Sequence, residues 1–76
     1  MPTLRELRIA RLWSQRELAR RAGVAEGTII FAETGRRLPR LLTMRRIADA
    51  LGVDWAEVAE FREAVAGVGE RRRPPA

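Results

Sequence analysis

Three short motifs mark where helices begin in this chain. Each consists of a capping residue followed three positions later by glutamate: Thr3 with Glu6, Ser14 with Glu17, and Asp54 with Glu57. In such a capping box the first side chain accepts a hydrogen bond from an unpaired amide of the first turn, and the glutamate accepts one from the capping residue's own amide. Because no stretch alternates between apolar and polar residues for long enough to predict a strand, we expect an all-α fold.

Glycines mark the helix ends. Gly23, Gly35 and Gly52 each follow a helical pattern of apolar residues, and glycine readily adopts the left-handed conformation that ends a helix. The pattern predicts five helices, at 4–11, 15–22, 26–34, 41–51 and 55–66. We expect residues 1–67 to form one domain and residues 68–76 to form a disordered basic tail.

The residue types that are missing argue against several classes of function. The 76 residues include no cysteine and no histidine, so the chain lacks the usual nucleophile, general base and metal ligands. The glutamates at positions 57, 60 and 63 follow helical spacing and are most simply a solvated face. We therefore expect no enzymatic activity, no metal and no cofactor. Since no apolar run approaches the ~18 residues of a membrane span and the N-terminus lacks a signal-peptide pattern, we expect a cytoplasmic protein.

The basic residues lie mainly in the first two-thirds of the chain. All fifteen are arginine, and the formal net charge is +5. Six of them fall within residues 1–22 and five within residues 36–46, whereas residues 47–70 hold six acidic residues. A basic surface of this kind favours binding to DNA, because cations released from DNA contribute much of the binding free energy.

The segment from Gln15 to Thr34 has the layout of a helix-turn-helix, with a tight turn at Gly23 between the two helices. In that arrangement the second helix lies in the major groove of DNA while the first crosses the backbone. The same spacing also fits an ordinary helical hairpin within a small bundle. Spacing alone therefore leaves both interpretations open.

Residues Leu4 to Val58 resemble the Cro/repressor (XRE-type) helix-turn-helix family. The matching segments are LRELRIARLWSQRELARRAGV, TII, the E-TGRR segment at Glu33–Arg37, and MRRIADALGV. The resemblance implies a five-helix, repressor-like DNA-binding domain with its helix-turn-helix at about 14–34. It also implies a transcriptional regulator that binds double-stranded DNA sequence-specifically, most simply a repressor on an inverted-repeat operator read through helix 26–34.

The resemblance assigns two sets of DNA contacts, position by position. The base-reading candidates are Glu26, Gly27, Thr28 and Phe31. The phosphate-contact candidates are Gln15, Arg16, Arg36, Arg37 and Arg40, although a merely solvated loop is the alternative interpretation of the last three. The reading helix departs from the family, which usually offers Ser, Arg, Gln or Asn there. Glu26 can accept a hydrogen bond from a cytosine amino group, and Thr28 or Phe31 can contact a thymine methyl.

A further departure concerns the turn after the first helix. Leu12 stands where the family commonly has a glycine in the left-handed conformation. A side chain in that conformation strains the backbone by roughly 1–2 kcal/mol.

The sequence leaves the protein partners open. Phe61 and Val65 are the candidates for a homodimer interface, unless both belong to the core. A second hypothesis is an antitoxin-like or other protein-binding module on the same scaffold, with a toxin or another regulator as partner and DNA binding secondary. The apolar Ile30 and Phe31 favour that hypothesis, whereas Gln15 and the arginine loop favour DNA.

Overall fold

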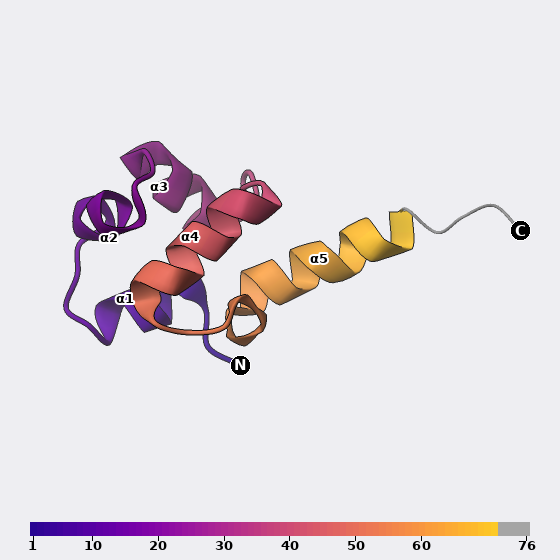
Figure 1. The fold of residues 1–76 in the computed structure, drawn as a ribbon, viewed down its shortest axis with the longest axis horizontal. Coiled ribbons are helices and arrows are strands. Elements are labelled where there is room, and N and C mark those ends of the chain that lie inside the picture. The colour runs from indigo at the N-terminus through magenta and orange to yellow at the C-terminus, as the bar shows by residue number, and fades with distance from the viewer. Residues whose placement is uncertain (72–76) are drawn as a thin grey trace, which may run out of the picture.

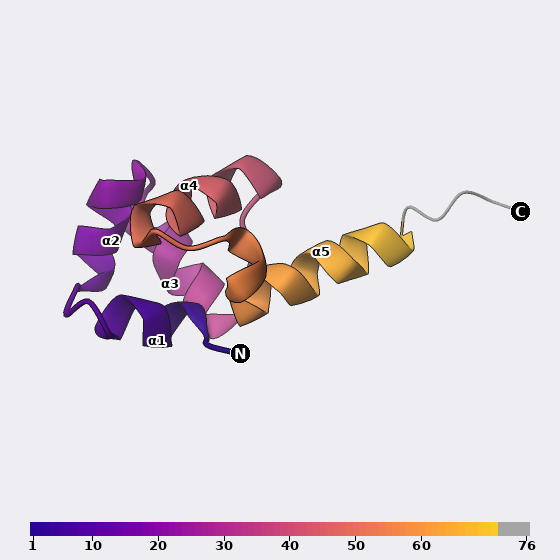
Figure 2. The same cartoon turned by 60° about the horizontal axis from the view of Figure 1, so that its bottom comes forward.

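The computed structural model describes residues 1–71, with side chains described as far as Ala66 (Figure 1). Its helices are α1 (Leu4–Ile9), α2 (Gln15–Ala22), α3 (Glu26–Thr34), α4 (Leu41–Leu51) and α5 (Ala59–Arg71), with a 3₁₀ turn, η1 (Trp55–Glu57), before α5. The predicted all-α class with five helices is confirmed, since residues 1–71 contain no strand. Figures 1 and 2 show α1 to α4 grouped together and α5 projecting away from them.

The predicted bounds of α2, α3 and α4 agree with the structure. Each of these helices ends at a left-handed glycine, with φ of 70° at Gly23, 73° at Gly35 and 74° at Gly52. The first helix ends earlier than predicted, at Ile9 rather than at Arg11.

The prediction of a single helix at 55–66 is wrong at both ends. Val58 is extended, with φ −96° and ψ 117°, and this separates η1 from α5. Helix α5 then continues to Arg71, so residues 68–71, predicted to begin the tail, are helical. No proline occurs before Pro74 in this part of the chain, and glycine lowers helix stability without blocking the backbone hydrogen bonds as proline does. The rest of the predicted tail, residues 72–76, lies outside the described residues.

Two of the three predicted capping boxes are complete. The Glu6 carboxylate accepts from the Thr3 amide at 2.9 Å while the Thr3 hydroxyl accepts from the Glu6 amide at 3.1 Å, and the box between Asp54 and Glu57 is formed likewise. The backbone hydrogen bond at Thr3 also holds the pKa of Glu6 below its usual value.

The third predicted box, at Ser14, is half formed. Its hydroxyl accepts from the Glu17 amide at 3.0 Å, but the Glu17 carboxylate binds Arg20 and Arg21 instead of returning to Ser14. Competing charge-assisted hydrogen bonds to arginine explain the difference.

The hydrophobic core draws side chains from all the helices. Its large, fully buried members are Leu4, Leu18, Ile29, Ile47, Val58 and Phe61. Burial of each contributes on the order of 1.5–3 kcal/mol to folding. The first turn of α5 is therefore part of the core, although its later turns leave the body of the domain.

Residues near the N-terminus are tied to the start of α5. The Leu4 amide donates to the Glu60 carboxylate at 2.9 Å, and the Ala59 amide donates to the Pro2 carbonyl at 3.0 Å. One of the unpaired amides at the start of α1 is thus satisfied by a side chain from the far end of the domain.

The turn between α1 and α2 contains the strained residue predicted from the sequence. Leu12 has φ 58°, and its side chain is 92% exposed. Arg11, in this turn, connects it to α1 and to the end of α4. Its guanidinium donates to the carbonyls of Leu7 at 2.7 Å and Leu51 at 2.6 Å. Leu12 therefore keeps a left-handed backbone without any packing of its own side chain.

Leu12→Gly is expected to stabilise the protein by about 0.5–1 kcal/mol, because glycine removes the strain but makes the unfolded chain more flexible. The midpoint of thermal unfolding should rise by a few degrees, about 2–6 °C. Leu12→Ala is the matched control, since it removes the same exposed apolar surface but keeps the Cβ. An equal gain from both variants would show that the strain is not the cause.

Candidate nucleic-acid interface

Helices α2 and α3 are joined by a tight turn that begins at Gly23. The left-handed Gly23 ends α2, and the Val24 amide then donates back to the Ala19 carbonyl at 3.0 Å. Ala19, at 3% exposure, and the fully buried Ile29 fill the angle between the two helices. The small Ala19 side chain lets the helices cross closely, so α3 is held across α2 with one side free.

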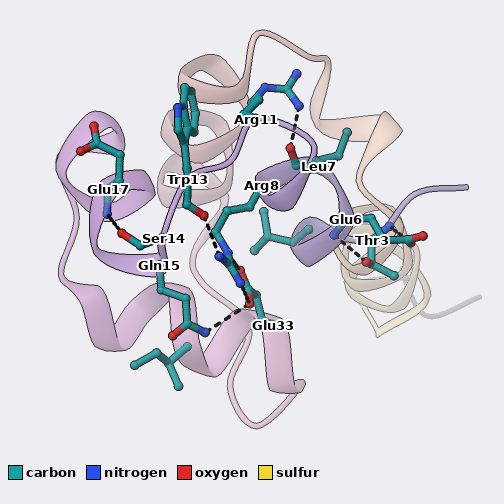
Figure 3. Close-up of polar contacts among 12 residues, drawn as sticks. Thr3, Glu6, Leu7, Arg8, Arg11, Trp13, Ser14, Gln15, Glu17 and Glu33 are labelled. Carbon is teal, nitrogen blue, oxygen red and sulfur yellow. Dashed lines mark hydrogen bonds and ion pairs between the residues drawn. The ribbon is translucent and has the colours of Figure 1, made fainter.

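An ion pair fixes the end of α3 to α1. The Arg8 guanidinium donates to both carboxylate oxygens of Glu33, from Nε at 2.6 Å and from Nη2 at 3.1 Å (Figure 3). Its Nη1 donates to the Trp13 carbonyl at 2.7 Å. The side chains of Arg8 and Glu33 are only 10% and 4% exposed. A buried, bidentate pair of this kind specifies orientation as well as contact.

Gln15 is the third member of this cluster. Its Nε2 donates to Glu33 Oε1 at 3.2 Å, so α1, α2 and α3 meet at one carboxylate (Figure 3). An amide nitrogen carries two hydrogens, and one of them remains for a further acceptor. Since Gln15 is also the first residue of α2, the positive end of the helix dipole lies beside it. This position suits a phosphate oxygen.

The outer face of α2 carries a second charged group. The Glu17 carboxylate accepts from Arg20 and, at 2.8 Å, from Arg21, and the Arg21 guanidinium lies 4.2 Å from the centre of the Trp13 ring. The hydrogen bond from Arg20 is the main reason that the pKa of Glu17 lies below its usual value. Arg16 forms no such pair among the described residues and is exposed.

The candidate base-reading side chains lie on the free side of α3. Phe31 is 43% exposed, Glu26 is exposed, and Gly27 and Thr28 are half-buried. The helix begins without a side-chain cap, because Ala25 occupies the capping position. Its first turn is therefore held only by the backbone, through bonds such as the one from the Thr28 amide to the Ala25 carbonyl at 3.0 Å.

A groove of about 540 Å³ runs along this side of α3. We call it the α3 groove. One wall comes from α3 and the residue before it and consists of Ala25, Gly27, Thr28 and Phe31; the other comes from the following loop and the start of α4 and consists of Arg37, Leu38, Pro39, Arg40 and Thr43. The groove brings together three of the four base-reading candidates and two of the five phosphate-contact candidates. Glu26, Gln15, Arg16 and Arg36 lie outside it.

The two dimer-interface candidates differ in burial. Phe61 is 0% exposed within a single chain, so its side chain is unavailable to a partner. Val65 is half-buried and packs against the edge of the core. The core interpretation that the sequence left open therefore holds for Phe61.

Sequence reasoning missed the roles of Arg8 and Glu33. Glu33 belongs to the E-TGRR segment, but nothing local to it indicates a partner 25 positions away. An arginine on the buried side of α1, one turn after the buried Leu4, was the available signal.

Comparison with known proteins agrees with this architecture. The helix-turn-helix family model matches residues 4–58. A protein of Methanothermobacter thermautotrophicus described as an uncharacterized HTH-type transcriptional regulator is 50% identical over 44 residues, which are 58% of this chain and 64% of that protein. The chain thus spans less than two thirds of that relative's length. None of the solved structures matches the chain.

No helix within residues 1–71 is long and apolar enough to cross a membrane. The family match covers most of the chain, and its segment contains α2, the Gly23 turn and α3. The chain belongs to the Cro/repressor (XRE-type) helix-turn-helix family.

Proposed function

We propose that the protein binds double-stranded DNA sequence-specifically and regulates transcription, acting as a repressor on an inverted-repeat operator. The observation that carries the proposal is the α3 groove, which joins the free side of α3 to the arginine loop after it. A helix presented in this way fits the major groove, which is wide enough to admit it. The arginines beside it then lie where the sugar-phosphate backbone passes.

Two elements supply phosphate contacts in this proposal, the start of α2 and the loop after α3. Gln15 donates its second amide hydrogen at the start of α2, and Arg16 extends from the next position. Arg36, Arg37 and Arg40, all exposed, follow α3 in the loop. These contacts set the position of the domain on the duplex, whereas the side chains of α3 meet the base edges.

We further propose that the active form is a homodimer. One small domain contacts too few base pairs to be selective, and two copies on half-sites about 34 Å apart multiply the discrimination. Since Phe61 is unavailable, a contact through α5 would use Val65 and the turns that project from the body (Figure 2).

A protein-binding module of the antitoxin type is the second candidate. The observation that favours it is a group of exposed leucines: Leu38, which lines the α3 groove, at 43%, and Leu41 and Leu42, at the start of α4, at 57% and 61% exposure. Adjacent exposed apolar side chains are a common feature of protein interfaces. A partner bound there would cover Leu38 in the α3 groove and exclude DNA from it, so such a partner would also control DNA binding.

Selection of bound duplexes from a random-sequence DNA library, washed at about 0.15 M salt, tests the proposal. We expect recovery of an inverted repeat whose half-sites are about one helical turn apart. A single half-site without symmetry would support sequence reading by a monomer and contradict the dimer. Retention of no duplex, or of duplexes sharing no motif, would contradict sequence-specific binding and favour the protein-binding candidate.

A further inference from the structure

Gly27 is a glycine that the fold of the chain does not require. Its φ is not positive, unlike that of Gly23, Gly35 and Gly52. A Cβ built on Gly27 meets no atom within 4 Å, so no neighbouring side chain excludes a larger residue. Glycine inside a helix is less favourable than alanine, and a frequent reason for it is close approach of another molecule to the backbone. Gly27 therefore leaves a stretch of α3 backbone uncovered by any side chain in the lining of the α3 groove, and we call this open space the notch at Gly27.

Phe31 lies one turn further along the same side of α3. Residues four apart in a helix are neighbours on its surface, so the Phe31 side chain lies on the same side as Gly27, although more than 4 Å from the position of a Cβ there. The ring is 43% exposed and offers neither a hydrogen-bond donor nor an acceptor. Gly27 and Phe31 thus form an apolar part of this wall that cannot hydrogen-bond to a base edge, whereas the hydroxyl of Thr28 on the same wall can.

The opposite wall indicates what kind of molecule enters the groove. Arg37 and Arg40 lie on it, with Leu38 and Pro39 between them. Two arginines facing an apolar wall complement a molecule that is anionic on one side and apolar on the other. A DNA strand has this character where a thymine projects its C5 methyl group into the major groove beside the phosphates. An apolar peptide would leave both guanidinium groups without counter-charges.

We propose that Gly27 and Phe31 form a methyl-reading site for thymine, in which the methyl group enters the notch at Gly27 and packs against the Phe31 ring. The inference rests on the proposed function and specifies its chemistry: recognition along this part of α3 depends on shape and apolar contact. Thymine is selected over cytosine by its methyl group, and Glu26, outside the groove, contributes no part of this discrimination.

Replacement of single thymines by deoxyuridine in the selected duplex tests the site, because it removes the methyl group and leaves the pairing edge unchanged. One thymine in each half-site should show a loss of affinity of about 4-fold, the effect of burying one methyl group (~0.8 kcal/mol). Phe31→Ala should bring the ratio of thymine to deoxyuridine affinity close to 1. Leu42→Ala, which removes an exposed apolar side chain outside the groove, should leave the ratio unchanged.

Gly27→Ala gives a second, independent readout. The added methyl group should occupy the notch, so the variant should bind the deoxyuridine duplex at least as well as the thymine duplex. Its thermal midpoint should be no lower than that of the unsubstituted protein, since nothing in the fold requires glycine. Loss of the preference without loss of stability separates a role in recognition from a role in folding.

Each other outcome has a definite meaning. A recovered motif in which no thymine-to-deoxyuridine change alters affinity overturns the methyl-reading site but leaves sequence-specific binding intact. A deoxyuridine effect that persists in both Phe31→Ala and Gly27→Ala assigns the methyl group to other residues and also overturns the site. Failure to retain any duplex overturns both the site and the proposed function.

Discussion

Glu33→Ala is expected to lower the free energy of unfolding by about 3–5 kcal/mol, the usual cost of removing one partner of a buried ion pair. The substitution leaves the Arg8 guanidinium buried with the Trp13 carbonyl as its remaining partner in this cluster and no counter-charge. A domain of this length is typically stable by about 4–11 kcal/mol in total, so the substitution removes a large share of that free energy and should strongly lower the urea concentration at the unfolding midpoint. Urea unfolding, followed by far-UV circular dichroism and tryptophan fluorescence, measures the loss.

The double variant Arg8→Met with Glu33→Leu is the control. It replaces the pair by apolar side chains of similar volume, and such replacements are often neutral or stabilising. We expect it to recover most of the stability that Glu33→Ala loses. If the stability of Glu33→Ala stays within about 1 kcal/mol of that of the unsubstituted chain, the buried pair does not hold α3 to α1.

Arg36→Ala with Arg37→Ala is expected to weaken DNA binding by roughly 30-fold at 0.15 M salt, on every sequence alike. Each phosphate contact adds about 0.9 to the slope of log affinity against log salt concentration, so loss of two contacts should flatten the slope by about 1.8. If the plots of log affinity against log salt concentration for the two proteins meet at 1 M salt, a slope difference of about 1.8 corresponds to a roughly 30-fold loss of affinity at 0.15 M. Titrations of the selected duplex and of a random duplex at several salt concentrations measure both quantities.

Arg45→Ala with Arg46→Ala provides a control of the same charge. These arginines are also adjacent and exposed, but they lie on α4 rather than in the loop that follows α3. The two double variants carry the same net charge, so a difference between them reports position rather than overall electrostatics. Equal weakening in both would contradict specific phosphate contacts by Arg36 and Arg37.

Local signals predicted the helices and the left-handed turns well. The caps at Thr3 and Asp54 and the glycines that end α2, α3 and α4 act through neighbouring residues, so the sequence carries their whole effect. The left-handed Leu12 was also predictable, but only from the family resemblance. Residue type alone gives no reason to place a leucine in that conformation.

Long-range contacts could not be predicted in the same way. The pairing of Arg8 with Glu33 and the binding of Gln15 to the same carboxylate depend on how α1, α2 and α3 are placed in space. The burial of Phe61 likewise depends on the break at Val58, which turns α5 so that its first turn enters the core. The half-formed box at Ser14 was missed because two arginines compete for the Glu17 carboxylate.

For the candidate site, the sequence identified positions but not their grouping. Gly27 and Phe31 were expected to face bases, yet the notch became apparent only with the empty space around the Gly27 backbone. The wall formed by Arg37 and Arg40 depends on the path of the loop, which sequence patterns describe poorly.

The tie between the Leu4 amide and the Glu60 carboxylate has a consequence for how the chain acquires its structure during synthesis. The donor leaves the ribosome early, whereas its acceptor follows 56 positions later. Helices α2, α3 and α4 can meet as soon as they emerge, because their contacts are close in sequence. The start of α1 must wait until residue 60 has been synthesised before the Leu4 amide finds its partner and the core around Leu4 is completed. The hydrogen bond at the start of α1 is therefore made late in synthesis, and a nascent chain paused before residue 59 lacks Phe61 in its core and leaves apolar surface exposed to the chaperones around it.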